Sequence, residues 1–276
     1  MYKTAILCYN VIRRQVMKNK KSACFSNIKL FLEGVIILII SCTTSVFSSD
    51  DLLLAYWNFE NNDSAEITDE SGNELHGTII GSEDSYNFVK GIRGNAFQIS
   101  GPDVYIKTGN RIDIGTSDFT IELWIRRRGG KDADLVTKRR DAGEDGFQLR
   151  LIGNKISFGI MGVNAPTAKY IEVRTADIAV LGNSDWHHLV CPIERNKPNI
   201  IMYVDGNPFP AQGIDPALAK EVNLGNSGMS FLYIGGWCYN DTRLISNFEG
   251  IIDEVRIYKR ALTSDEIKRN FNSSKK

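Results

Sequence analysis

The stretch Asp118–Arg126, DFTIELWIR, decides the fold class of this chain. Its aliphatic and phenyl side chains occupy every second position, at Phe119, Ile121, Leu123 and Ile125. Successive side chains of a β-strand point to opposite faces, so this period of two predicts a half-buried strand.

The same alternation recurs further along the chain. Phe147–Leu151 and Ile156–Ile160 repeat it, and Gly153-Asn154 between them suits a tight hairpin turn. Further strands are predicted at Asn199–Val204, Phe231–Ile234 and Ile251–Tyr258. Many short strands between Asp51 and Tyr258 predict an all-β fold, and the pattern alone leaves a two-sheet sandwich and a barrel open.

A helix is predicted only at the C-terminal end. Thr263 and Glu266 form a capping box, in which each side chain bonds the other residue's backbone N–H. Ile267 and Phe271 then share one face of a short helix.

Charge separates the first 48 residues from the rest. The 276-residue chain has 33 basic and 33 acidic residues. Residues 1–48 hold seven of the basic residues and one acid, Glu33. Residues 49–276 therefore carry a net charge near −6. A mildly acidic body lacks the basic footprint of nucleic-acid binding, so no nucleic-acid partner is expected.

Residues 1–48 resemble an export leader. Basic residues precede the apolar run Gly34–Ile40, which is short for a membrane span. Two processing schemes remain open: a lipobox that would place a lipid on Cys42, or cleavage after Ser48. The sequence therefore predicts a leader at 1–48 and one exported domain at 49–276, secreted or held at the cell surface through the leader or a lipid.

Short motifs narrow the fold further. They lie at Leu54–Glu60, Asp69–Thr78, Gly94–Ile99, Asp118–Ile125, Trp186–Val190, Met202–Gly206 and Gly250–Tyr258. In this order they resemble laminin-G-like domains of the concanavalin A-like lectin/glucanase type. The resemblance covers about residues 52–271 and implies an antiparallel two-sheet jelly-roll sandwich with a short C-terminal helix.

The same resemblance implies a structural calcium ion that ties the first strand to the closing strand. The matching ligand positions are Glu60, Asn73, the His76 main chain and Asp253. Asp253 is expected to share the inward face of its strand with Val255 and Ile257, and a buried carboxylate needs a partner. The alternative is that Glu60 and Asp253 are hydrogen-bonded acids without a metal.

Catalysis is not expected. Glucanases of this architecture place acids on alternate positions of one strand, and the chain has no such run. His187 and His188 are adjacent, so one should point inward and the other outward.

Two surface features are candidate binding sites. Trp237, Tyr239, Asn240 and Asp241 combine aromatic and planar polar groups in a predicted loop and form the candidate glycan-binding rim, with hairpin packing as the alternative. Basic residues at 126–128, 131 and 138–140 flank a Gly-Gly turn and are expected to meet on one hairpin. The preferred interpretation is a solvated hairpin whose nearby acids balance the charge, and the alternative is a patch that holds anionic groups. The two body cysteines, Cys191 and Cys238, are either bridged or two buried thiols.

The sequence thus predicts a non-catalytic exported binding module, with a polysaccharide or glycoconjugate as its partner. A protein-interaction scaffold without a sugar site is the alternative, and a glycoside hydrolase of the same fold is the third hypothesis.

Overall fold

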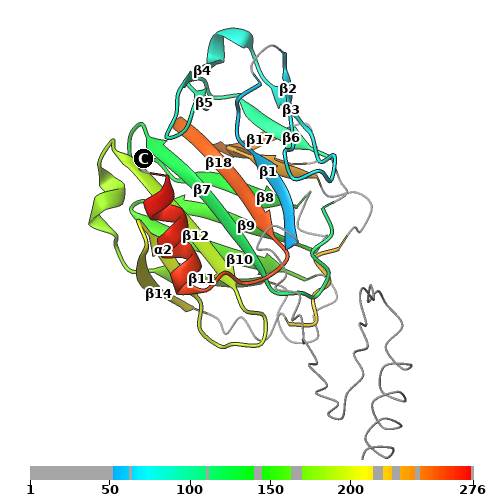
Figure 1. The fold of residues 1–276 in the computed structure, drawn as a ribbon, viewed down its shortest axis with the longest axis vertical. Coiled ribbons are helices and arrows are strands. Elements are labelled where there is room, and N and C mark those ends of the chain that lie inside the picture. Colours follow the sequence, from blue (N-terminus) through cyan, green and yellow to red (C-terminus); the bar gives the residue numbers. More distant parts are fainter. Residues whose placement is uncertain are drawn as a thin grey trace, which may run out of the picture. The chain divides into compact units, whose positions relative to one another are not determined.

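The computed structural model describes residues 52–61, 64–109, 112–139, 145–162, 170–213, 220–225, 231–239 and 243–274. Their fold is an antiparallel β-sandwich with one short helix, as predicted from the sequence (Figure 1).

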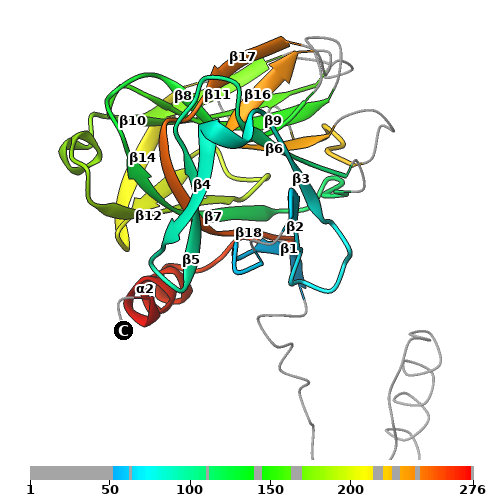
Figure 2. The ribbon, with the colours of Figure 1, turned by 90° about the horizontal axis from the view of Figure 1, so that it is seen from above.

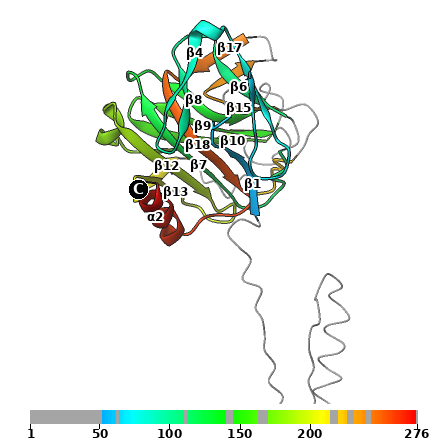
Figure 3. The ribbon, with the colours of Figure 1, turned by 45° about the horizontal axis from the view of Figure 1, so that its top comes forward.

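The first sheet, called here the β7 sheet, is built around the diagnostic stretch. Its strands, in spatial order, are β4 (Tyr86–Lys90), β5 (Asn95–Ile99), β18 (Gly250–Tyr258), β7 (Phe119–Arg127), β12 (Trp186–Ile193) and β13 (Ile201–Val204). Strand β1 (Leu53–Trp57) also pairs with β18, beside which it lies in Figure 3.

The second sheet, called the β9 sheet, faces the first. Its strands, in spatial order, are β2 (Glu66–Ile67), β3 (Gly77–Ile80), β6 (Tyr105–Thr108), β15 (Leu232–Ile234), β8 (Ala133–Lys138), β9 (Gly146–Ile152), β10 (Lys155–Met161) and β11 (Tyr170–Thr175). Strand β14 (Asn207–Gly213) pairs with both β13 and β11 and so joins the two sheets along one side.

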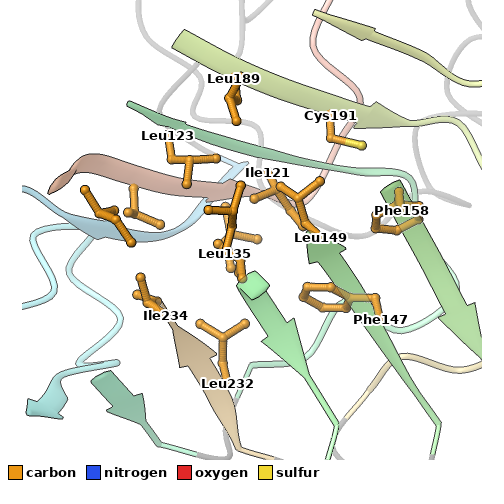
Figure 4. Close-up of a cluster of buried hydrophobic side chains, with 14 of the residues drawn as sticks. Ile121, Leu123, Leu135, Phe147, Leu149, Phe158, Leu189, Cys191, Leu232 and Ile234 are labelled. Carbon is orange, nitrogen blue, oxygen red and sulfur yellow. The ribbon is translucent and has the colours of Figure 1, made fainter. Parts of the chain in front are cut away.

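The core lies between the sheets. Alternate residues of β7 and β12 meet alternate residues of β8, β9, β10 and β15, as Figure 4 shows for Ile121 and Leu123 opposite Leu135 and Leu149. The period of two read from the sequence therefore places the apolar side chains inward, where they are removed from water.

The C-terminal helix covers the outer face of the β7 sheet (Figure 1). Helix α2 (Ser264–Ser273) begins at Thr263 with the predicted capping box. Its Ile267 is buried, and Phe271 stacks on Trp124 with ring centroids 5.7 Å apart. Because α2 shields this face, the polar members of the β7 pattern are also buried, and the strand is not half-buried as the sequence predicts.

A small two-stranded sheet lies on the opposite side of the molecule from α2 (Figure 2). It consists of β16 (Gly236–Tyr239) and β17 (Arg243–Asn247). It packs on the outer face of the β9 sheet at β8, β15 and β6. Two short 3₁₀ turns, η2 (Glu83–Ser85) and η3 (Ala179–Gly182), complete the described elements.

Candidate functional site

The outward-facing residues of β9, β10 and β11 form a polar surface, called here the β9–β11 face. Its members are Gln148, Arg150, Ser157, Gly159, Tyr170, Glu172 and Arg174. They alternate with core residues such as Leu149, Phe158 and Val173, so strand geometry alone places them on one face.

The strand register aligns these side chains in rows. Arg150 lies opposite Ser157, and Ser157 opposite Arg174. In the next row, Gln148 lies opposite Gly159, and Gly159 opposite Glu172. Directly opposed side chains lie within about 5.5 Å of each other at Cβ, so each row is a line of adjoining groups.

Glu172 is held in place from two sides. The Ser157 hydroxyl donates to one carboxylate oxygen at 2.6 Å, and the Arg174 guanidinium donates to the other at 2.6 Å. Burial acts to raise the pKa of Glu172, but the hydrogen bonds from Arg174 and Ser157 outweigh it and lower the pKa. Glu172 is therefore a fixed anion, and Arg174 stays accessible to solvent, with 47% of its side chain exposed.

Tyr170 forms the aromatic part of this face. Its side chain lies over Gly159, where an added methyl group would be 2.8 Å from the phenol oxygen. Burial and the charge of Glu172 raise the pKa of the Tyr170 hydroxyl, while Arg150 and Arg139 act in the opposite direction. Tyr170 nevertheless stays 38% exposed, among the most exposed large hydrophobic side chains of the described residues.

Asp134 on β8 lies where the β9–β11 face meets the β16–β17 sheet. Its side chain is buried and accepts hydrogen bonds from Gln148, from the Ser246 hydroxyl of β17 and, at 3.3 Å, from Thr137. The Arg150 Nε lies 4.0 Å from the same carboxylate. These contacts fasten the β16–β17 sheet beside the open face.

Trp237, the described member of the predicted glycan rim, lies in strand β16 rather than in a loop. It packs beside the buried cluster of Tyr105, Tyr233 and Cys238, and the Arg139 guanidinium lies 4.0 Å from the centroid of its ring. This is the hairpin packing that the sequence left open as the alternative. The Tyr239 side chain, Asn240 and Asp241 lie outside the described residues, so the four-residue rim stays a prediction.

Two of the four predicted calcium ligands meet at one turn. The Asp253 carboxylate accepts hydrogen bonds from Ile92 N at 2.8 Å and Arg93 N at 3.3 Å. The Glu60 carboxylate accepts from Asn95 N at 3.2 Å, in the same turn between β4 and β5. Among the described residues, the hydrogen-bond partners of both carboxylates are backbone N–H groups.

The side chains of the other two predicted ligands bond to different residues from those that bind Glu60 and Asp253. Asn73 donates to the carbonyls of Leu53 and Leu54 at the start of the strand, and the His76 ring accepts from Asp69 N at 3.0 Å. Strand β1 spans Leu53–Trp57, so Asn73 lies beside the first residues of the strand, whereas Glu60 follows its last residue. Among the residues that the structure describes, no three His, Cys, Asp or Glu side chains gather as a metal site. Calcium binding stays a prediction, centred on Glu60 and Asp253.

The residue that organises the loop after β1 is Asp69, which the sequence analysis did not select. Its buried carboxylate accepts from Tyr56 N at 2.8 Å, Leu75 N at 2.9 Å and the Ser71 hydroxyl at 2.8 Å. The sequence feature that could have identified it is its position at the start of the Asp69–Thr78 motif, two residues before the Ser-Gly-Asn turn.

The predicted inward orientation of Asp253 is wrong, because β18 contains a β-bulge after this residue. Asp253 lies opposite Trp124, whose ring stacks under α2, so it belongs to the outer face of the β7 sheet. Glu254 takes the extra position with φ of 54°, and the alternation resumes one residue later. Burial and the charge of Glu254 raise the pKa of Asp253 to about 8, against the lowering effect of the backbone N–H donors.

The predicted basic hairpin is also wrong. Arg126 and Arg127 lie on β7 and Lys138 on β8, which belong to different sheets, and Arg140 lies outside the described residues. Arg127 is buried and donates to the carbonyls of Gly153 and Leu181, and Lys138 is buried and donates to Gly225 O at 2.8 Å. Arg127 and Lys138 therefore hold loops of the sandwich and do not contribute to a shared exposed surface.

The two adjacent histidines of β12 point to opposite faces of the strand. His187 lies opposite the core residue Ile125, whereas His188 lies opposite Trp124 on the outer face, as predicted.

Cys191 and Cys238 are free, buried thiols in separate clusters, so the bridged alternative does not hold. Cys42 and the rest of the proposed leader lie outside the described residues. In the described part of the chain, no helix is long and apolar enough to cross a membrane.

The sequence analysis missed the β9–β11 face because it did not mark Tyr170–Thr175 as a strand. The signal was present: Tyr170, Glu172 and Arg174 alternate with Ile171 and Val173. What the sequence does not contain is the pairing order that brings β11 beside β10 and β9.

The fold and this arrangement of sheets agree with a family assignment. The family model of the concanavalin A-like lectin/glucanases superfamily matches residues 100–268. The chain belongs to this superfamily.

Its curated relatives include non-toxic nonhemagglutinins. The type E protein of Clostridium botulinum is 25% identical over 156 residues, covering 55% of this chain and 12% of the relative. The type C protein of Clostridium botulinum C phage is 21% identical over 210 residues, covering 75% of this chain and 16% of the relative. This chain therefore spans less than a fifth of the length of these relatives.

Similar solved structures share the fold at low identity. The binding domain of Paraclostridial Mosquitocidal Protein 1 has a TM-score of 0.60 at 21% identity, covering 82% of this chain and 53% of that one. Domain 4 of AbnA, an arabinanase of Geobacillus stearothermophilus solved in complex with arabinotriose, has a TM-score of 0.58 at 20% identity, covering 79% and 97%. The binding domain of botulinum neurotoxin DC in complex with SialylT has a TM-score of 0.58 at 15% identity, covering 82% and 52%.

Proposed function

We propose that the protein is a non-catalytic carbohydrate-binding module, which holds a glycan on the β9–β11 face. The observation that carries the proposal is Tyr170, an exposed aromatic side chain seated over Gly159 and bordered by Arg150, Glu172 and Arg174.

Sugar recognition needs both parts of this arrangement. The apolar face of a pyranose or furanose ring packs on an aromatic side chain, which contributes apolar contact at a small entropic cost. The ring hydroxyls then need planar polar partners, and Glu172 and Arg174 supply an acceptor and several donors within one row of the sheet. Since Ser157 and Arg174 already fix Glu172, little order has to be gained when a glycan binds.

The comparisons support a binding role in general terms. Domain 4 of AbnA, which matches over nearly its whole length, was solved with an oligosaccharide bound. The neurotoxin domains of the same fold were solved with SialylT or with rat synaptotagmin II. The first two cases favour a glycan as the partner, and the third keeps a protein partner as the alternative.

The spacing of the acids on this side of the molecule disfavours glycoside hydrolysis. Asp134 on β8 and Glu172 on β11 face the same way but are separated by three strand-to-strand steps. At about 4.8 Å per step, the separation is on the order of 14 Å. Retaining and inverting hydrolases need their carboxylates about 5 to 9.5 Å apart.

The proposal includes export. The apolar run Gly34–Ile40 after a basic segment supports a leader, and Cys42 is the position where a lipid would be attached. Mass determination of the mature protein tests this part. A mature chain that begins at Cys42 with an added diacylglycerol supports anchoring, and one that begins after Ser48 supports free secretion.

The glycan site is tested by a glycan array followed by affinity electrophoresis with the polysaccharides that give signals. Tyr170→Ala is expected to weaken binding by roughly tenfold or more, because one stacked ring and its buried area are lost. Tyr170→Phe keeps the ring and should retain most of the affinity. Ile201→Ala, at an exposed position of the β7 sheet, is the matched control and should bind normally.

Two results would contradict the proposal. One is glycan binding that Tyr170→Ala leaves unchanged, which would place the site elsewhere. The other is the absence of binding to any glycan, which would favour the protein-interaction alternative.

A further inference from the structure

A second surface feature lies on the other side of the molecule, between α2 and β18. It is a cavity of about 240 Å³ lined by residues of β18, of the segment that leads into α2, of the helix itself and of the turn between β4 and β5. Its volume is just below the roughly 300 Å³ at which small-molecule pockets begin. A cavity of this size suits a single charged group or one sugar unit.

Arginines dominate the lining of this cavity. It contains Arg93, Arg256, Arg260 and Arg269, with Glu266 as the single acid. Such an excess of guanidinium groups is unfavourable without counter-charges, and it is the composition that binds oxyanions, because guanidinium donates two parallel hydrogen bonds to them.

Two of the four arginines are already neutralised by partners. Arg260 forms a bidentate pair with Glu266, with both N–O distances at 2.8 Å. Arg256 bonds the buried Glu254, and its guanidinium carbon lies 4.0 Å from the ring centroid of Tyr56. These contacts form rigid walls.

The other two arginines keep donors available. Arg93 is exposed and donates from one nitrogen to Ser273 O at 3.2 Å, while its other terminal nitrogen lies 4.0 Å from Glu254. Arg269 is exposed on α2 and makes no hydrogen bond or ion pair with the described part of the chain. Glu254 is thus shared between Arg93 and Arg256, and Arg269 has no carboxylate partner among the described residues, so the cavity mouth keeps an excess of positive charge.

The helix that carries Arg269 is fixed to the sheet. Asn270 donates to both oxygens of the buried Glu122, at 3.0 and 3.1 Å, and Phe271 stacks on Trp124 and His188. Arg269 therefore projects from a stationary support next to Asn270, and the cavity exists before any ligand arrives. A preformed site loses little conformational entropy on binding.

We propose that this cavity is an oxyanion-binding site, which takes a sulfate, phosphate or carboxylate group through Arg93 and Arg269. Arg256 and Arg260, each paired with a carboxylate, form the walls of the site. The proposal does not depend on the glycan site, which lies on the opposite face of the sandwich.

Helix anchoring alone does not account for this lining. Arg93 does cap the last turn of α2 through the Ser273 carbonyl. Arg269, however, contributes nothing to that anchoring in the described structure, since the helix is held by Asn270, Phe271 and Ile267.

The test is isothermal titration calorimetry of the full chain with inorganic phosphate, inorganic sulfate and glucuronate, each at constant ionic strength set with sodium chloride. Saturable binding of at least one anion is expected, and the order of the three affinities distinguishes phosphate, sulfate and sugar carboxylate as the natural group. Arg269→Gln and Arg93→Gln should each weaken binding by on the order of tenfold, because each removes a charge-assisted contact.

Arg128→Gln is the matched control, since it removes the same charge from an exposed position at the end of β7 and should bind like the unmodified chain. Arg269→Lys keeps the charge without the planar fork and should fall between the two. Equal affinity in all four variants, or no saturable heat with any of the three anions, would overturn the proposal. Thermal melts of every variant exclude loss of the fold as the cause.

Discussion

At the scale of single residues, Glu122 is the most constrained ionisable group under the C-terminal helix. Its side chain is buried, with His188 Nε2 at 2.7 Å, the Tyr258 hydroxyl at 2.9 Å and the Asn270 amide on both oxygens. Burial acts to raise its pKa, but the hydrogen bonds and charges of His188, Arg256 and Tyr258 outweigh burial and lower the pKa to about 2. Glu122 is thus ionised in the folded protein across most of the acid range.

This pKa predicts how stability depends on pH. A carboxyl with a depressed folded pKa stabilises the protein above its unfolded value of 4.5, and the contribution is lost as the pH falls from there toward 2. At about 1.4 kcal/mol per pH unit, the loss is on the order of 3 kcal/mol. Glu122→Gln should therefore flatten the fall in unfolding free energy between pH 4.5 and 2, as measured by urea denaturation. Parallel pH profiles for the two proteins would show that Glu122 is not the source.

At the scale of elements, the turn between β4 and β5 connects three strands that are distant in the sequence. Its backbone N–H groups bind Glu60 after β1 and Asp253 in β18. Gly94 has a φ of 41°, a conformation that favours glycine, and a Cβ at this position would displace the Glu60 carboxylate. Two carboxylates at one turn are a partial fit for a hard cation, which prefers more oxygen ligands.

Calcium at this turn is expected to act on stability. If the ion binds the folded chain, calcium raises the melting temperature and EDTA lowers it, because a ligand of the folded state stabilises that state by mass action. Asp253→Asn should abolish the difference between the two conditions. Asp84→Asn, an exposed acid in η2, should leave it intact. Identical melts with calcium and with EDTA would show that the N–H donors alone satisfy both acids.

Predictability from sequence also differs by element. The alternation in β7, β9 and β10 and the capping box of α2 are local signals, and both were predicted correctly from the sequence. The bulge at Glu254 was not, since a single residue with positive φ reverses the facing of Asp253 without altering the apolar pattern. Similarly, the basic residues of β7 and β8 are close in the sequence, but the chain crosses between the sheets there.

At the scale of the whole molecule, the two proposed sites lie on opposite faces. Helix α2 and the β16–β17 sheet cover different sides of the sandwich (Figure 2), which leaves the β9–β11 face open on one side and the arginine cavity on the other. Neither location follows from local sequence, because each depends on which strands become neighbours. This is why the candidate sites were less predictable than the fold.

The separation of the two faces predicts independent binding. Saturating phosphate or sulfate should change the glycan affinity by less than about twofold, because sites without shared contacts are energetically close to additive. Arg269→Gln should leave glycan retention unchanged, and Tyr170→Ala should leave anion titrations unchanged. A larger reciprocal effect would reveal coupling through the shared core.

The pairing of β1 with β18 has a mechanical consequence. Leu53 lies opposite Tyr258 and Trp57 opposite Val255, so the chain enters β1 and leaves β18 at the same end of the pair. Tension between residues 53 and 258 would load the inter-strand hydrogen bonds one after another, in an unzipping geometry, rather than all at once in shear. Under force the first strand would therefore peel away before the rest of the sandwich yields.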